Sequence, residues 1–139
     1  MPSLALPQKN APSRALVSPG IPPDPFRAAC PTRMVLDHVA DKWAGLVLRL
    51  VARGPRRFNA LRREVEGISP KVLSGVLKRL ERDGLVSRRA FATVPVTVEY
   101  AATPLGLTLD AALGHVVDWA EANIAAVLDA QAAYDRRAP

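Results

Sequence analysis

The sequence has little cysteine, few aromatic residues and no long apolar run. Its single cysteine, Cys30, excludes an intrachain disulfide framework and a multi-cysteine zinc site, so the fold must rest on packing. Aromatic residues make up only 5% of the chain, which disfavours a stacking platform for single-stranded nucleic acid. No apolar run approaches the length of a membrane span, and the N-terminus lacks a signal-peptide core. We therefore expect a soluble protein of the reducing cytoplasm, without a membrane partner.

Residue patterns typical of catalysis are also missing. The chain has no Gly-rich phosphate loop, no paired carboxylates in an apolar setting and no nucleophile next to a base. His38 and His115 stand far apart, and neither has an acidic residue at ligand spacing. We therefore predict a protein that is not an enzyme and has no cofactor and no metal site.

Acidic residues are scarce in the middle of the chain. With 139 residues and 49% hydrophobic residues, the chain is long enough for one ordinary core. The net charge is +6, and residues 30–100 hold 14 Lys and Arg against 7 Asp and Glu, whereas residues 101–139 hold 2 against 5. A cationic middle favours a polyanionic partner, because neutralised phosphates release their counterions.

Proline and glycine divide the chain into segments. Residues 1–29 contain seven prolines and no hydrophobic periodicity, and we predict a disordered arm there, without an assigned site. Residues 30–132 are predicted to form the folded domain and residues 133–139 a tail. Apolar residues recur at helical spacing from Thr32 to Val51, as two helices or one bent helix, before Arg53-Gly54-Pro55 stops the pattern.

A pair of short helices is predicted next. The first covers residues 58–65 and ends at Gly67; the second begins at Ser69-Pro70, which supplies an N-cap oxygen and a preset first turn, and stops at Gly84. Its apolar side is predicted to be buried and consists of Val72, Leu73, Val76, Leu77 and Leu80. Its other side has three cations and no acid, and consists of Lys71, Ser74, Gly75, Lys78 and Arg82.

A β-hairpin and a long helix complete the predicted order. Residues 85–89 and 96–100 are rich in β-formers and are separated by a Thr93-Val94-Pro95 turn. The last helix begins at Thr103-Pro104 and runs nearly to Gln131. Its apolar stripe is too broad for one small domain to cover, which favours a homodimer. The predicted dimer-interface residues are Leu109, Leu113, Val116, Ala120, Ile124 and Val127.

The fold class that follows is mainly α with a small β-hairpin: a winged helix-turn-helix with a long C-terminal dimerisation helix. Such a device reads double-stranded DNA, with its second helix in the major groove. The predicted DNA-binding residues are Ser69, Lys71, Ser74, Lys78 and Arg82 on that helix, Arg62 and Arg63 on the preceding one, and Arg88 and Arg89 at the base of the wing.

Ordered motifs from Cys30 to about Trp119 also resemble a known family, the HxlR-type regulators, bacterial winged-helix proteins related to the MarR group. They are Cys30-Pro31, Asp41-Lys42-Trp43, Gly54-Pro55-Arg56-Arg57-Phe58-Asn59-Ala60-Leu61-Arg62-Arg63, Gly67-Ile68-Ser69-Pro70-Lys71-Val72-Leu73, Leu80-Glu81-Arg82-Asp83-Gly84-Leu85-Val86, Val98-Glu99-Tyr100 and Thr103-Pro104-Leu105-Gly106. The resemblance implies a transcriptional regulator that binds a two-fold symmetric operator as a homodimer joined through its terminal helices. Paired reading helices of such a dimer enter successive major grooves, about 10 base pairs apart.

Two features of the resemblance leave alternatives open. Family members commonly carry longer polar side chains at the positions of Gly75 and Val76, which supports a rival function, a winged-helix module that binds an acidic protein partner. Cys30 matches a cysteine that some members use to sense oxidants or electrophiles. Lys42 or a positive helix end could lower its pKa, so a sensor of a small-molecule or oxidant effector and an unreactive packed thiol are both open.

Overall fold

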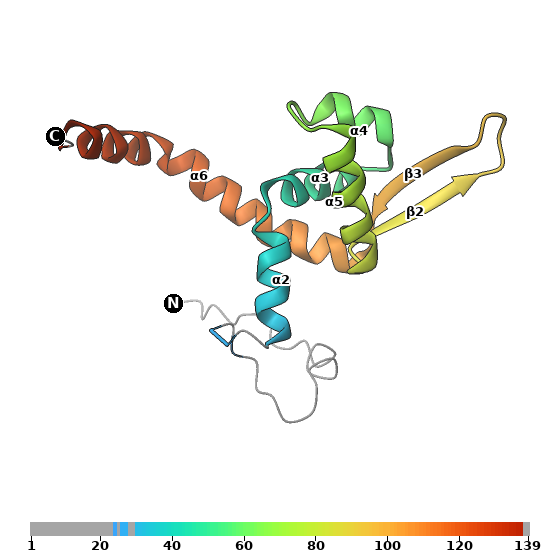
Figure 1. The fold of residues 1–139 in the computed structure, drawn as a ribbon, viewed down its shortest axis with the longest axis horizontal. Helices are drawn as coiled ribbons and strands as arrows, with labels where there is room; N and C mark the ends of the chain where they lie inside the picture. Colours follow the sequence, from blue (N-terminus) through green and yellow to red (C-terminus); the bar gives the residue numbers. More distant parts are fainter. Residues whose placement is uncertain (1–23, 25, 28–29, 138–139) are drawn as a thin grey trace, which may run out of the picture. The chain divides into compact units, whose positions relative to one another are not determined.

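The computed structural model describes residue 24, residues 26–27 and residues 30–137 (Figure 1). Most of the predicted N-terminal arm, residues 1–29, lies outside the described residues. The chain groups into two compact units, Met1–Ala40 and Asp41–Pro139. The boundary between these units falls between the first two helices, at Ala40.

The apolar pattern between Thr32 and Val51 forms two separate helices. α2 covers Pro31–Val39 and has proline in its first turn. α3 covers Lys42–Ala52 and begins where an Asp41 carboxylate oxygen accepts a hydrogen bond from the backbone N–H of Trp43, at 2.9 Å. An N-cap of this kind satisfies one of the free N–H groups at a helix start, which is why α3 begins at this residue.

The predicted helix pair is confirmed as α4, Phe58–Glu64, and α5, Pro70–Arg82. Ser69 caps α5, because its Oγ accepts a hydrogen bond from the backbone N–H of Val72 at 3.1 Å. Gly67, with φ +89°, turns the chain between the two helices, and Gly84, with φ +77°, turns it after α5. Only glycine adopts this left-handed backbone without strain, so both turns depend on it.

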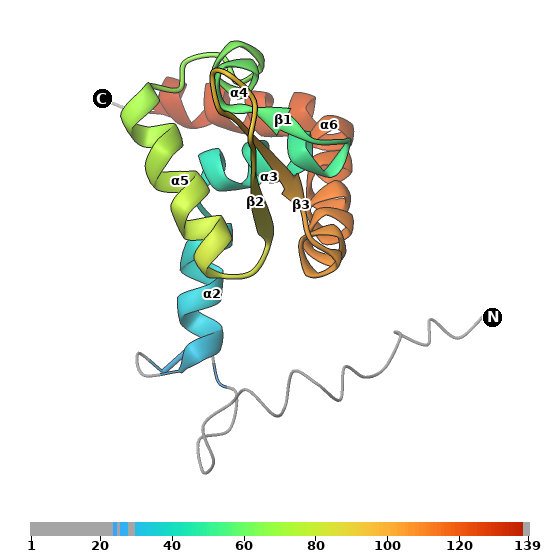
Figure 2. The ribbon, with the colours of Figure 1, turned by 90° about the vertical axis from the view of Figure 1, so that its right-hand side faces the viewer.

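The wing is part of a three-stranded antiparallel sheet (Figure 2). The strands are β1, Arg56–Arg57, β2, Val86–Phe91, and β3, Thr97–Ala102, in the order β1-β3-β2. β2 and β3 confirm the predicted hairpin, and both end two residues later than expected. β1 was not predicted, because two residues are too few to show an alternating pattern.

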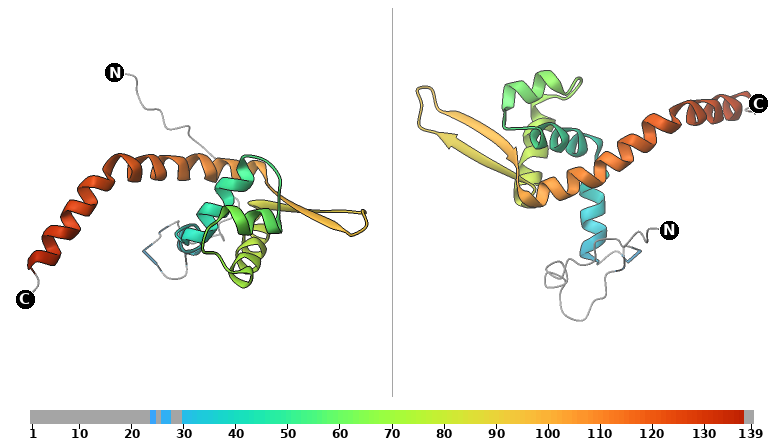
Figure 3. Two further views of the ribbon diagram at one scale, coloured as in Figure 1. Left: turned by 90° about the horizontal axis from the view of Figure 1, so that it is seen from above. Right: turned by 180° about the vertical axis from the view of Figure 1, so that it is seen from behind.

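The last helix, α6, covers Pro104–Arg137 and is 34 residues long. Thr103 caps it: its Oγ1 accepts a hydrogen bond from the backbone N–H of Gly106 at 3.0 Å and donates one to the carbonyl oxygen of Gly84 at 2.6 Å. The helix passes Gln131, so the residues predicted as a tail are helical as far as Arg137. Figure 3 shows its C-terminal half extending beyond the other elements of its unit.

The core lies between α3, α4, α5 and the sheet. Its buried residues are Ala44, Val47, Leu48, Val51, Leu61, Val65, Ile68, Leu73, Val76, Leu77, Leu80, Leu85 and Val86. Val72 was predicted to belong to it, but this side chain is 40% exposed. The prediction was wrong because Val72 lies at the edge of the apolar face, about 100° around the helix from Leu73. The predicted fold class, a winged helix-turn-helix with a long C-terminal helix, is confirmed.

Candidate nucleic-acid interface

The exposed side of α5 brings the predicted reading residues together on one surface. Lys71, Gly75, Lys78 and Arg82 follow the spacing i, i+4, i+7 and i+11, and all four are exposed. Ser74 beside them is half-buried, and Ser69 stands at the helix start with its oxygen engaged in the cap. We call Lys71, Gly75, Lys78 and Arg82 the reading face.

Val76 is not part of this surface. Its side chain is 2% exposed and lies in the core, whereas Gly75 is exposed and a Cβ built there would have no atom within 4 Å. Val76 was predicted to lie on the buried side of the helix, and its burial confirms this, so the missing long polar side chain at this position does not change the exposed surface. The rival function, binding of an acidic protein partner, loses one of its two supports.

Arg79, a cation of α5 outside the predicted site, points toward α3. Its Nη2 lies 2.8 Å from Oδ2 of Asp41, whose other oxygen caps α3. One carboxylate therefore joins the last turn of α5 to the start of α3. An Asp directly before a helical pattern is a cap signal in the sequence, but the choice of Arg79 as its partner depends on how the two helices pack.

The same contacts set the acidity of Asp41. Partial burial raises the pKa of its carboxyl, but hydrogen bonds from the backbone N–H groups of Trp43 and Ala44, together with the Arg79 guanidinium, outweigh it and lower the pKa below the ordinary value. The charged form is thus favoured in the folded state. The stabilisation is complete above the unfolded pKa, about 3.9, and is lost as the pH falls through the lower folded value.

Replacing Asp41 by Asn isolates the charge, because Asn caps helices as well as Asp does. We expect Asp41→Asn to lower the free energy of unfolding at pH 7 by roughly 0.5–1 kcal/mol, the size of a partly exposed ion pair. The difference from wild type should shrink below about pH 4. Urea unfolding across this pH range measures it, with Asp129→Asn on α6 as the matched control. A difference that stays constant down to about pH 2 would contradict this assignment.

The other predicted cations flank the reading face on two elements. Arg62 and Arg63 are exposed in the last turn of α4 and line, with Asn59 and Ile68, a hollow of about 340 Å³. Arg88 and Arg89 are exposed on β2, and the Arg89 guanidinium lies 5.0 Å from the centre of the Phe91 ring. All four cations are thus exposed, two on α4 and two on β2.

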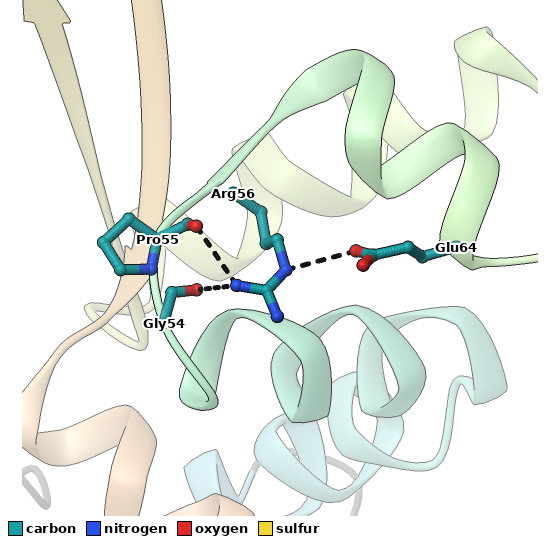
Figure 4. A network of polar contacts seen from close by, with 4 residues as sticks. All are labelled: Gly54, Pro55, Arg56 and Glu64. Atoms are coloured by element: carbon teal, nitrogen blue, oxygen red, sulfur yellow. Dashed lines mark hydrogen bonds and ion pairs between the residues drawn. The ribbon is translucent and has the colours of Figure 1, made fainter.

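A second hollow, of about 670 Å³, lies between the start of α4 and β3, and sequence reasoning missed it. Its cationic lining includes Arg57 and Arg63. The neighbouring Arg56 is occupied: its Nε lies 3.2 Å from Oε2 of Glu64, and its Nη1 donates to the carbonyl oxygens of Gly54 and Pro55 (Figure 4). Adjacent strand residues point to opposite sides, so Arg56 holds β1 against the end of α4 while Arg57 is exposed.

The proposed dimer stripe on α6 divides into two parts. Leu109 and Leu113 are half-buried and pack against the core of their own chain, and their predicted role in a dimer interface stays a prediction. Further along the helix, Val116 is 62% exposed, Ile124 is 52% exposed, Ala120 is exposed and Val127 is half-buried. We call Val116, Ala120, Ile124 and Val127 the distal stripe.

An ion pair joins the near part of α6 to α3. Nη1 of Arg49 lies 3.3 Å from Oδ1 of Asp110 and donates to the Asp110 carbonyl oxygen at 3.2 Å. Next to this pair is a hollow of about 480 Å³, whose lining includes Leu46, Arg49, Leu50 and Val117. Small-molecule sites have volumes of this order. The predicted small-molecule effector stays a prediction.

Cys30 lies in the first unit, directly before α2, and its side chain is 2% exposed. Its sulfur accepts a hydrogen bond from the backbone N–H of Asp24 at 3.2 Å. Burial raises the pKa of the thiol, but this bond, the Thr32 hydroxyl and the N–H groups of Thr32 and Arg33 lower it by more, so the net shift is downward. The N–H groups at the start of α2 are thus among the groups that lower the thiol pKa, as predicted for a helix end.

No helix among the described residues combines the length and the apolar character of a membrane span. Within the same residues, no group of His, Cys, Asp and Glu side chains could hold a metal ion.

Comparison with known proteins identifies this arrangement. The HxlR-like helix-turn-helix family matches residues 38–127, a range that begins after Cys30. The HTH-type transcriptional regulator YtfH of Escherichia coli K12 is 42% identical over 103 residues, which cover 74% of this chain and 82% of that protein.

Two solved structures show the same fold. YtfH from Salmonella typhimurium has a TM-score of 0.74 and 38% identity, over 79% of this chain and 98% of that one. The redox regulator HypR in its oxidised form has a TM-score of 0.63 and 36% identity, over 68% of this chain and 97% of that one. The chain therefore belongs to the HxlR-like helix-turn-helix family and is a transcriptional regulator of the helix-turn-helix type.

Proposed function

We propose that the protein is a homodimer that binds a two-fold symmetric operator, with α5 of each protomer in the major groove. The reading face is the observation that carries this proposal: three exposed cations on one side of a capped helix whose other side is buried. Phosphate contacts from Lys71, Lys78 and Arg82 would supply affinity, and Arg62, Arg63, Arg88 and Arg89 would contact the flanking backbone. Ser69 and Ser74 lie at the end and edge of the same helix, within reach of base edges.

The distal stripe supports the dimer. Its apolar residues lie on a long helix whose C-terminal half extends beyond the rest of its unit (Figure 3). An exposed apolar stripe of this kind is buried when two helices pair, and equal stripes on two copies form a symmetric interface. Pairing through α6 would place two reading faces on one duplex.

The double variant Lys71→Ala/Lys78→Ala tests the DNA interface. The logarithm of the binding constant falls as the logarithm of the salt concentration rises. Each lost phosphate contact makes this slope shallower by about 0.9, so the loss of four contacts per dimer should make it shallower by about 3.6. Fluorescence anisotropy with duplex from directly upstream of the gene, over a range of salt concentrations, measures this slope. Arg136→Ala, which removes a cation at the far end of α6, is the control and should leave the slope unchanged. Wild-type binding without salt dependence, or without preference for this duplex over random DNA at physiological salt, would refute the proposed function.

We further propose that Cys30 makes the regulator responsive to oxidants or electrophiles. The support is its hydrogen-bonded position before α2, its lowered pKa and the similarity of the chain to the redox regulator HypR. With one cysteine per chain, oxidation can yield a bridge between two Cys30 residues or a mixed disulfide with a small thiol.

Treatment with diamide and glutathione is expected to change the operator affinity of the wild type severalfold and to leave Cys30→Ser unchanged. The rate of alkylation of Cys30 near neutral pH provides a second readout. Equal responses of the two proteins, or a rate no faster than that of an ordinary free thiol, would leave Cys30 as a packed, unreactive residue.

A further inference from the structure

Gly75 stands in the middle of α5 without a structural reason inside the chain. Its backbone is helical, unlike the positive-φ glycines Gly54, Gly67 and Gly84, so its conformation does not require glycine. A Cβ at this position would meet nothing within 4 Å, so packing does not require it either. Glycine is less favourable than alanine in a helix interior. The usual reason for glycine that remains is close approach by something outside the chain.

The surroundings of Gly75 indicate what approaches. Val72, one turn earlier on the helix, is 40% exposed and presents apolar methyl groups beside the bare position. Lys71 and Lys78, at i−4 and i+3, flank it on the reading face and are both exposed. Arg79, which also lies one turn away, points to Asp41. The result is a small apolar notch between two cations.

We propose that Val72 and Gly75 form a specificity-determining notch that receives the C5-methyl group of a thymine. Among the groups that unmodified base pairs present in the major groove, this methyl is the apolar one, and apolar side chains read it. The lysines beside the notch contact phosphates, and the missing side chain at Gly75 lets the base edge come close to the helix backbone. The inference rests on the proposed function, because it requires α5 in the major groove.

In this proposal, affinity and sequence specificity come from different residues. Phosphate contacts by Lys71 and Lys78 hold the protein on any duplex, whereas the fit of a methyl group depends on sequence. Filling the notch should therefore weaken binding to the operator and leave binding to random duplex almost unchanged.

Gly75→Ala and Gly75→Leu fill the notch without disturbing the fold, since the space around the position is open. We expect Gly75→Ala to raise the thermal midpoint, and Gly75→Leu to lower operator affinity at least tenfold while affinity for random duplex stays within twofold of wild type. An unchanged ratio of operator to random affinity in Gly75→Leu would overturn the proposal.

Replacing thymines by uracil in the operator, one symmetric pair at a time, tests the methyl group directly, because uracil differs only by its absence. For the wild type, replacing the thymine that the notch contacts should lower affinity about fourfold for each half-site, because each half-site loses one buried methyl group. For Val72→Ala, the same replacement should have a smaller effect. Equal affinities at every position would overturn the notch but leave the proposed function intact. A wild type that does not prefer the operator would overturn both.

Discussion

Replacing Gly106 by alanine is expected to lower the free energy of unfolding by about 3 kcal/mol or more, the upper end of what overpacking costs. A Cβ at Gly106 would overlap with the carbonyl oxygen of Leu85. It would also lie 3.0 Å from the Leu85 carbonyl carbon and 3.4 Å from Cδ1 of Leu48. The same carbonyl oxygen accepts a hydrogen bond from the N–H of Thr103. Backbone cannot move aside as a side chain does, so α6 must shift or the bond must break.

Chemical unfolding at one fixed protein concentration measures this effect, with Gly75→Ala as the matched control. Both variants add one methyl group to a helix, but the space at Gly75 is open, so Gly75→Ala should gain up to about 1 kcal/mol from helix propensity. The two substitutions are therefore expected to have opposite signs. If Gly106→Ala is as stable as wild type, α6 does not start against Leu85 as the structure has it.

The second large effect is expected from Ile124→Asp in the distal stripe. The side chain is 52% exposed within one chain, so the fold of that chain should tolerate the change. In a symmetric dimer, each interface would contain two unpaired carboxylates, and burying one unpaired charge costs several kcal/mol. At about 1.4 kcal/mol per factor of ten, we expect the dissociation constant of the dimer to rise at least a hundredfold. Operator binding should weaken with it, because two linked reading helices become two separate ones.

Analytical ultracentrifugation and operator titration measure the two effects in the same samples. Ala122→Asp is the control, because Ala122 is exposed on the side of α6 that carries Asp118 and Asp129, away from the distal stripe. It introduces the same charge two residues away and should leave the dimer intact. A dimer that is unaffected by Ile124→Asp would show that the two protomers meet elsewhere.

Helix boundaries could be predicted from the sequence because they depend on local chemistry. Ser69 and Pro70 start α5, and Gly67 and Gly84 adopt the left-handed turns that end the helical segments. Caps and turns of this kind involve residues within a few positions of one another. The inner and outer sides of α5 followed from helical periodicity in the same way, with Val72 at the edge as the exception.

Pairings between distant residues could not be predicted in this way. The sequence assigned no role to Arg79, and only the packing of α5 on α3 places it beside Asp41. β1 exists only because β3 pairs with it, through Arg56 opposite Tyr100 and Arg57 opposite Glu99. Leu109 and Leu113 share the heptad pattern of the distal stripe, and only the packing of α6 on the core shows that these two side chains are half-buried within their own chain.

The single unbroken helix from Pro104 to Arg137 has a consequence for how the length of the chain can change. Each residue inserted into a helix turns everything after it by about 100° and moves it by about 1.5 Å. An insertion between Asp110 and Val116 would therefore rotate the distal stripe relative to the wing, unless it adds seven residues, which restores the direction to within about 20°. The loop between Phe91 and Thr97 only connects two strands, so an insertion there does not rotate other elements relative to one another. Viable length variants of this regulator should therefore differ in the wing loop and not within α6.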